Sequence, residues 1–95
     1  MVRYQVHPDR VDENIALVQA VYAELAETSP AGFRYATYRC DDGVTFVHLA
    51  TSDGPPPLPG LAAFQRFQAG LPDRCAEPPV ATELREVGSY GGGPL

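Results

Sequence analysis

Hydrophobic and polar positions alternate over residues 2–6, a pattern typical of a β-strand that buries one of its two faces. Apolar residues then recur every three or four positions from Val11 to Leu25, which predicts an amphipathic helix of about four turns. We expect Asp9 or Asp12 to cap this helix, because a short carboxylate accepts hydrogen bonds from the free N–H groups of a first turn. The start of the chain therefore predicts a strand followed by a helix.

Two further strands and a hairpin turn are predicted next. Residues 33–40 are rich in aromatic and polar residues, which indicates an outer strand, whereas residues 44–50 are mostly apolar on both parities, which indicates a central one. Asp41, Asp42 and Gly43 between them are typical of a tight hairpin turn, in which Gly43 takes the positive φ. The two strands should therefore pair as antiparallel neighbours.

Proline-rich breaks divide the second half of the chain. Residues 52–59 contain four prolines and predict an extended loop. Helical spacing resumes from residue 60 to about residue 71, where Gly70 and Pro72 should end the second helix. After a break at Pro78 and Pro79, alternation over residues 80–87 predicts the last strand.

The order of these elements, βαββαβ, specifies an α+β fold of the ferredoxin-like type, a four-stranded antiparallel sheet with two helices on one face. We expect a single domain over residues 1–87 and a flexible glycine-rich tail over residues 88–95. The other face of the sheet would be uncovered and lined by aromatic residues such as Phe33, Tyr35 or Tyr38. Because a large exposed apolar patch marks an interface, we predict a homodimer in which the two sheets face each other and form a barrel-like core. A cavity should lie between sheet and helices or between the two sheets.

Composition and charge narrow the range of partners. The chain has 12 acidic and 7 basic residues, a net charge of -5, and its basic residues are scattered, which argues against a nucleic-acid partner. The N-terminal residues have a strand pattern rather than that of a signal peptide, and no apolar run is long enough to span a bilayer. We therefore expect a cytoplasmic protein with no membrane partner. Cys40 and Cys75 lie outside any CxxC motif and predict free, mostly buried thiols.

His48 is the strongest candidate catalytic residue, because it interrupts an otherwise apolar central strand. A neutral imidazole in the cavity would act as a base toward a phenol or enol, whereas the alternative is a core histidine bonded to a carbonyl or a tyrosine hydroxyl. Tyr4, Tyr35 and Tyr38 are candidates to stack on a flat ligand or donate to its oxygen, with dimer packing as their alternative role.

Phe64 lies on the apolar face of the second helix, which forms either core or a hydrophobic ligand pocket. The chain has no GxGxxG motif, no P-loop and no histidines and carboxylates at metal-ligand spacing, so we expect no cofactor and no metal. The predicted partners are a second copy of the chain and a small aromatic ligand.

Five short segments carry a family resemblance: residues 4–8, 12–14, 30–33, 39–46 and 61–64. With these segments the chain resembles small proteins of the antibiotic biosynthesis monooxygenase type, in the dimeric α+β barrel superfamily. The resemblance implies a ferredoxin-like homodimer that oxidises an aromatic or polyketide-like substrate with molecular oxygen and no metal or flavin, while other members degrade haem. In such an enzyme His48 would be the base, and Tyr35 or Tyr38 would position the ring.

Two positions depart from the pattern of this family. Phe64 stands where the second helix of active members often carries His, and Thr51 and Ser52 stand where a Trp commonly follows the third strand. These differences favour an alternative prediction, a non-catalytic dimeric ligand-binding or assembly protein of the same fold.

Overall fold

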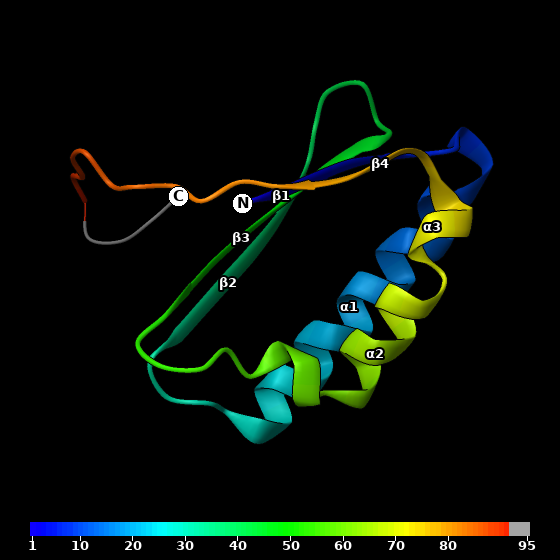
Figure 1. Cartoon of the computed structure of the whole chain (residues 1–95). Coiled ribbons are helices and arrows are strands. Elements are labelled where there is room, and N and C mark those ends of the chain that lie inside the picture. Colours follow the sequence, from blue (N-terminus) through cyan, green and yellow to red (C-terminus); the bar gives the residue numbers. More distant parts are fainter. Residues whose placement is uncertain (92–95) are drawn as a thin grey trace.

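One antiparallel sheet carries the strands, and the helices all lie on one of its faces (Figure 1). The computed structural model describes residues 1–91. The strands are β1 (Val2–Val6), β2 (Phe33–Arg39), β3 (Thr45–Ser52) and β4 (Cys75–Ala81), in the order β2-β3-β1-β4 across the sheet. The helices are α1 (Val11–Thr28), α2 (Ala62–Ala69) and α3 (Leu71–Arg74), with 3-10 turns η1 (Pro8–Arg10) and η2 (Leu58–Gly60). This is the ferredoxin-like α+β fold that the sequence predicts.

The first helix begins without the predicted aspartate cap. The N-cap residue of α1 is Arg10, and no side chain bonds to the free N–H groups there. Asp9 lies inside the preceding 3-10 turn, whose Arg10 N–H donates to the His7 carbonyl at 2.9 Å, and Asp12 lies inside the helix itself. The predicted cap is wrong because the 3-10 turn leads directly into the helix and leaves no extended residue at which a carboxylate can fold back.

The hairpin between β2 and β3 forms as predicted. Gly43 has a φ of 79°, which only glycine adopts readily. The Asp42 carboxylate accepts from the backbone N–H groups of Val44 and Thr45 at 3.0 and 2.9 Å, which fixes the turn. Pairing runs without interruption from Phe33 opposite Ser52 to the other end of β2, so β2 is an edge strand and β3 a central one, as the sequence predicts.

The last strand lies earlier in the chain than predicted. It begins at Cys75 and includes Pro78 and Pro79, which were expected to form a break, while residues 82–91 contain no strand. Within residues 1–91, β4 pairs with β1 alone, and its register slips twice along Arg3 to Val6. An edge strand with such irregularities accepts prolines, because their missing N–H groups need not pair with a neighbour.

The second helical segment is also divided differently. α2 ends at Ala69, and Pro72 lies within the short α3 instead of ending the helix. Proline is accepted there because a first helical turn has free N–H groups anyway. The predicted loop over residues 52–59 forms largely as expected, although β3 extends through Ser52 and η2 begins at Leu58.

The two faces of the sheet differ in cover. Phe33 and Tyr35, which were expected on the open face, point instead toward the helices, where Tyr35 stacks on Tyr22 of α1 with ring centroids 5.3 Å apart. Tyr38 has the opposite parity, lies on the face without helices and is 44% exposed. The expectation was wrong for the first two residues because aromatic residues occur on both parities of β2, so the composition alone does not select a face.

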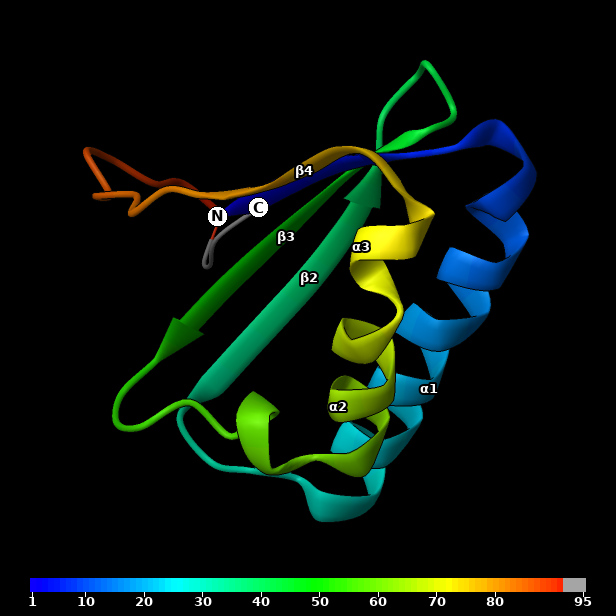
Figure 2. The ribbon, with the colours of Figure 1, turned by 45° about the vertical axis from the view of Figure 1, so that its right-hand side comes forward.

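Figure 2 shows the chain after β4 running away from the sheet and helices. Residues 82–91 are exposed, and residues 92–95 of the predicted tail lie outside the described part of the chain. Both cysteines in the described part are free, but Cys40 is exposed rather than buried because it directly follows the edge strand β2. Within residues 1–91, no helix has both the length and the apolar character needed to cross a membrane.

Candidate functional site

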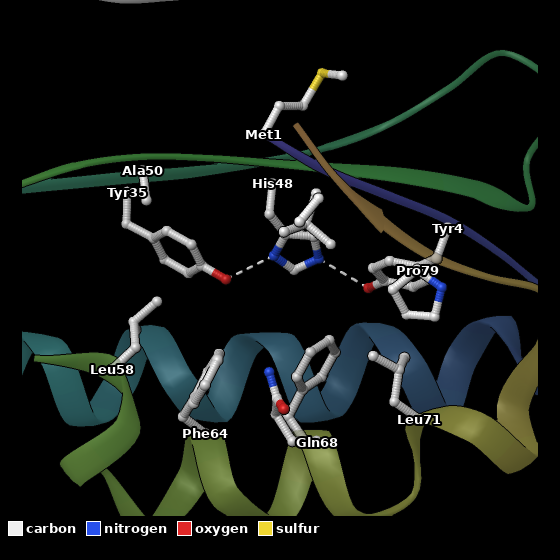
Figure 3. A pocket seen from close by; sticks show the side chains of 13 residues that line it. Met1, Tyr4, Tyr35, His48, Ala50, Leu58, Phe64, Gln68, Leu71 and Pro79 are labelled. Carbon is white, nitrogen blue, oxygen red and sulfur yellow. Dashed lines mark hydrogen bonds between the residues drawn. The ribbon is translucent and has the colours of Figure 1, made fainter. Parts of the chain in front are cut away.

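A cavity of about 350 Å³ lies between the covered face of the sheet and α2 (Figure 3). Its position is one of the two that the sequence left open. Apolar side chains form most of the wall, and the polar groups are the Tyr4, Tyr35, His48 and Gln68 side chains. The lining residues are Met1, Val2, Tyr4, Tyr35, His48, Ala50, Leu58, Phe64, Phe67, Gln68, Leu71, Pro79 and Ala81. A mostly apolar pocket with a few converging polar groups is typical of small-molecule sites.

His48 lies at the centre of this site because β3 is a central strand. The register places Val2 of β1 on one side of it and Thr37 of β2 on the other. Its Nε2 is 2.8 Å from the Tyr4 hydroxyl, and its Nδ1 is 2.6 Å from the Tyr35 hydroxyl and 3.2 Å from the Thr37 hydroxyl. Both ring nitrogens are therefore held by hydroxyl groups.

The hydrogen bonds continue from Tyr4 into the helices. Asn14, on the first turns of α1, donates from Nδ2 to the Tyr4 hydroxyl at 2.9 Å. Arg74, at the end of α3, donates from Nε to Asn14 Oδ1 at 3.1 Å and from one terminal nitrogen to the Phe67 carbonyl at 2.9 Å. Its guanidinium also lies over the Phe67 ring, 5.2 Å from the centroid. Side chains from three helices and three strands thus meet below the cavity.

Burial keeps the titratable groups of this cluster neutral, Arg74 excepted. It lowers the pKa of His48 from 6.5 to about 4, because the charged imidazolium would lose its hydration. For the same reason it raises the pKa of Tyr4 to about 12 and also raises that of Tyr35. At neutral pH the site therefore presents a neutral imidazole and two protonated phenols.

Aromatic rings surround the imidazole. The His48 ring centroid is 5.3 Å from that of Tyr4, 5.7 Å from that of Tyr35 and 5.5 Å from that of Phe67 on α2. Phe64 extends this surface, with its ring 6.1 Å from that of Phe67. Figure 3 shows Phe64 and Gln68 on the helix side of the cavity, facing Tyr35 and His48 on the sheet side. A flat molecule would find ring surfaces on both sides.

The structure brings four of the five candidate residues together. His48, Tyr4, Tyr35 and Phe64 line one cavity, whereas Tyr38 lies on the opposite face of the sheet, away from it. Tyr38 is therefore separated from the other four by the sheet itself.

Sequence reasoning did not assign Asn14, Gln68 or Arg74 to the site. Asn14 had a usable signal, because it falls in phase with Val11 and Val18 on the buried stripe of α1, where a polar residue must find a partner. Arg74 had none, since it follows a proline and an aspartate in what looks like a polar loop. Within residues 1–91, no three His, Cys, Asp or Glu side chains are grouped so as to hold a metal ion.

Comparison with known proteins supports the fold. No protein-family model and no curated protein matches the chain. Among solved structures, the chain is similar to Rv0793 from Mycobacterium tuberculosis, with a TM-score of 0.69 and 20% sequence identity over 92% of this chain and 94% of that one. The fold is ferredoxin-like. At this level of identity the likeness shows a shared architecture over nearly the whole chain and says nothing about the ligand.

Proposed function

We propose that this protein binds a small, neutral, flat aromatic molecule in the cavity between the sheet and α2. The observation that carries the proposal is the cavity itself, with apolar and aromatic walls around the hydroxyl of Tyr35 and the imidazole of His48. Its volume of about 350 Å³ is within the range of known ligand pockets. The predicted small aromatic ligand fits the rings of Phe64 and Phe67 on the helix side.

The lining favours a neutral ligand over a charged one. Among the described residues that line the cavity, none has an Asp, Glu, Lys or Arg side chain. A cation would lose its hydration there without an opposite charge in the wall, which is costly. The ammonium of Met1, a lining residue, already donates to the Thr82 carbonyl at 2.7 Å, which makes an anion less favoured as well. Arg74 belongs to the hydrogen-bonded cluster but is not among the lining residues, and two of its nitrogens donate to Asn14 and to the Phe67 carbonyl.

Filling the cavity tests this proposal. Ala50 lines the cavity, so Ala50→Trp should weaken the binding of fluorene, a flat hydrocarbon, by at least about tenfold in titration calorimetry. Ala23→Trp, at an exposed position of α1, is the matched control and should bind fluorene like the parent protein. Equal affinities in the two variants would place the ligand elsewhere, and no binding by the parent protein would contradict the proposal.

A second candidate function is oxidation of the bound aromatic molecule with molecular oxygen and no metal or flavin, as in the antibiotic biosynthesis monooxygenases that the chain resembles. The observation in its favour is the neutral imidazole of His48 in the cavity wall, hydrogen-bonded to two tyrosine hydroxyls that can pass a proton. Binding alone remains the better supported function, because a low pKa makes His48 a weak base and both of its nitrogens are already occupied.

Oxygen uptake distinguishes binding from oxidation. Turnover would consume one dioxygen per aromatic molecule. One oxygen atom, traceable with isotopically labelled dioxygen, would enter the product, and the other would leave as water with two hydrogens from the substrate, which is itself the reductant. His48→Gln would abolish this oxygen uptake while leaving the cavity open. A protein that binds the aromatic compound without taking up oxygen would be a ligand carrier or an assembly protein, the alternative that the sequence left open.

We also propose that the partner of the open face is a second copy of this chain. One register row across the sheet places Tyr38, Val47, Arg3 and Val80 side by side on that face. Tyr38 is 44% and Val80 59% exposed, which is unusual for large apolar residues gathered on one surface. Facing sheets would bury this row in a two-fold dimer, in line with the predicted dimeric barrel.

Light scattering tests the dimer. The parent protein should have twice the mass of the 10.2 kDa chain, and Tyr38→Glu combined with Val80→Glu should reduce it to that of the monomer. Gln19→Glu, at an exposed position of α1, adds a negative charge away from the row and should leave the dimer intact. A monomeric parent protein would contradict the proposal.

A further inference from the structure

The side chains below the cavity form a series of hydrogen bonds in which each one donates to the next. The donor and acceptor atoms determine in which direction this series runs. We refer to these five linked side chains as the donor chain: Arg74, Asn14, Tyr4, His48 and Tyr35. Its first step is decided by Arg74, because a guanidinium can donate hydrogen bonds but cannot accept them. The amide of Asn14 must therefore turn its oxygen toward Arg74, and its NH₂ group toward Tyr4.

The second step concerns the proton of Tyr4. Its oxygen accepts from Asn14 Nδ2 at 2.9 Å, and the side chain is 1% exposed, so its own hydrogen cannot turn to bulk water. In the described part of the chain, the remaining partner of this hydroxyl is Nε2 of His48, at 2.8 Å. Donation from Nε2 instead would leave the Tyr4 hydrogen without an acceptor among the described side chains, which is unfavourable for a buried hydroxyl. Tyr4 therefore donates, and Nε2 carries no proton.

The third step assigns the proton of His48. A neutral imidazole with a bare Nε2 carries its hydrogen on Nδ1, and burial among hydroxyls and rings keeps this ring neutral. Nδ1 donates to the Tyr35 hydroxyl, at 2.6 Å the shorter of its two contacts. The Thr37 hydroxyl, at 3.2 Å, is also bonded to Tyr22 at 2.8 Å. The Tyr35 oxygen thus accepts from the protein, which leaves its hydrogen for the cavity that this side chain lines.

We propose that the donor chain makes the Tyr35 hydroxyl a fixed hydrogen-bond donor to the ligand, so that the site selects neutral aromatic molecules carrying a carbonyl oxygen over the corresponding hydrocarbons. This inference rests on the proposed binding function and specifies the ligand's chemical class. Tyr35 is then a specificity-determining residue, and Asn14 and Arg74 are positioning residues that act through Tyr4 and His48. Because each member after Arg74 accepts a hydrogen bond from the preceding group, the bonds polarise one another in one direction.

A pair of compounds with one skeleton tests the selectivity. Fluorenone has a carbonyl where fluorene has a methylene group, so the two differ only at the proposed acceptor. The parent protein should bind fluorenone about tenfold more tightly, the effect of roughly one hydrogen bond. Tyr35→Phe should bring the ratio close to one with little change for fluorene. Tyr38→Phe, on the opposite face, is the matched control and should keep the parent ratio.

Infrared spectroscopy adds a readout at the bond itself. The carbonyl stretch of bound fluorenone should move to lower frequency in the parent protein and lose that shift in Tyr35→Phe. Equal affinities for the two compounds, or a shift that persists without the Tyr35 hydroxyl, would overturn the inference and leave binding in the cavity intact. Binding of neither compound would contradict the proposed function, and the ligand selectivity would fall with it.

The direction of the donor chain can be measured without any ligand. Long-range proton–nitrogen NMR correlations distinguish the two neutral forms of an imidazole, and His48 should carry its proton on Nδ1. The exposed His7 gives a second signal set in the same spectrum, assigned by His7→Gln. A proton on Nε2 of His48 would show that the chain runs the other way, and would overturn the inference whatever the ligand measurements give.

Asn14→Asp should reverse the donor chain. A carboxylate at this position keeps Arg74 as its partner but can only accept, so Tyr4 must donate to it. His48 then donates from Nε2 to Tyr4, and its bare Nδ1 takes the Tyr35 hydrogen away from the cavity. We expect the NMR signature of His48 to switch and the preference for fluorenone to disappear. Unchanged tautomer and selectivity in a folded variant would contradict the mechanism, and Tyr35→Phe tests the selectivity should this variant not fold.

Discussion

The covered and open faces of the sheet differ in the kind of residue that the same strands place on them. On β3, His48 points toward the helices and is 7% exposed, while its neighbours Val47 and Leu49 point to the other side and are only half-buried. The covered face thus contains a polar residue inside the molecule, and the open face presents apolar residues outside it. The proposed ligand site therefore lies on the covered face, and the proposed dimer contact lies on the open one.

The buried polar groups of the covered face are stable because they satisfy one another. Arg74 and Asn14 are 1% and 0% exposed, yet within residues 1–91 no buried side-chain nitrogen or oxygen lacks a hydrogen-bond partner. Such a network is favourable when complete and costly when one member is removed. Equivalent substitutions on the two faces should therefore have very different effects.

Removal of an arginine side chain should show the largest difference in stability between the two faces. Arg74→Met leaves Asn14 Oδ1 and the Phe67 carbonyl without their donor, and two such buried acceptors together should lower the free energy of unfolding by about 4 kcal/mol. Arg34→Met, at an exposed position of the open face, should change it by less than about 0.5 kcal/mol. Urea titrations of both variants measure the difference, and similar values would show that the network contributes little.

The second largest effect should come from acid, which lowers the stability of the protein through His48 on the covered face. In the unfolded chain His48 takes up a proton near its ordinary pKa of 6.5, whereas in the folded protein burial delays this to about 4. The unfolded state therefore binds more protons between these values, and stability falls as the pH decreases from 7 to 4, by about 3 kcal/mol from this residue. His48→Gln should lose that part of the pH dependence, while His7→Gln should retain it. Parallel pH profiles for the parent protein and His48→Gln would contradict a buried neutral imidazole.

Removing one hydroxyl should have the smallest effect. Tyr35→Phe takes one partner from His48 Nδ1, but the Thr37 hydroxyl at 3.2 Å can still accept, so we expect a loss of about 1 kcal/mol. Tyr38→Phe on the open face should have an effect close to zero in the monomer. Thermal unfolding of the two variants at low protein concentration gives the comparison, and a larger loss for Tyr38→Phe would reverse the roles assigned to the two faces.

Most elements could be predicted because their signals are local. The alternation over β1, the stripe from Val11 along α1 and the Asp-Gly turn before β3 depend on neighbours in the chain, and each lies where expected. The last strand could not be placed, since prolines normally exclude a strand and only the edge position of β4 allows them. His48 could be singled out because one polar residue in an apolar strand needs a partner.

The sequence by itself determined the order of the elements and the class of fold, because periodicity and turn residues act over a few positions, and it singled out His48 as a polar residue in an apolar strand. Only the tertiary structure decided which parity of β2 faces the helices, which put Tyr35 in the cavity and Tyr38 outside it. It also brought Arg74 to Asn14 across 60 positions of the chain. Such contacts depend on how the helices pack on the sheet. A pattern of neighbouring residues does not specify which residues far apart in the chain will meet.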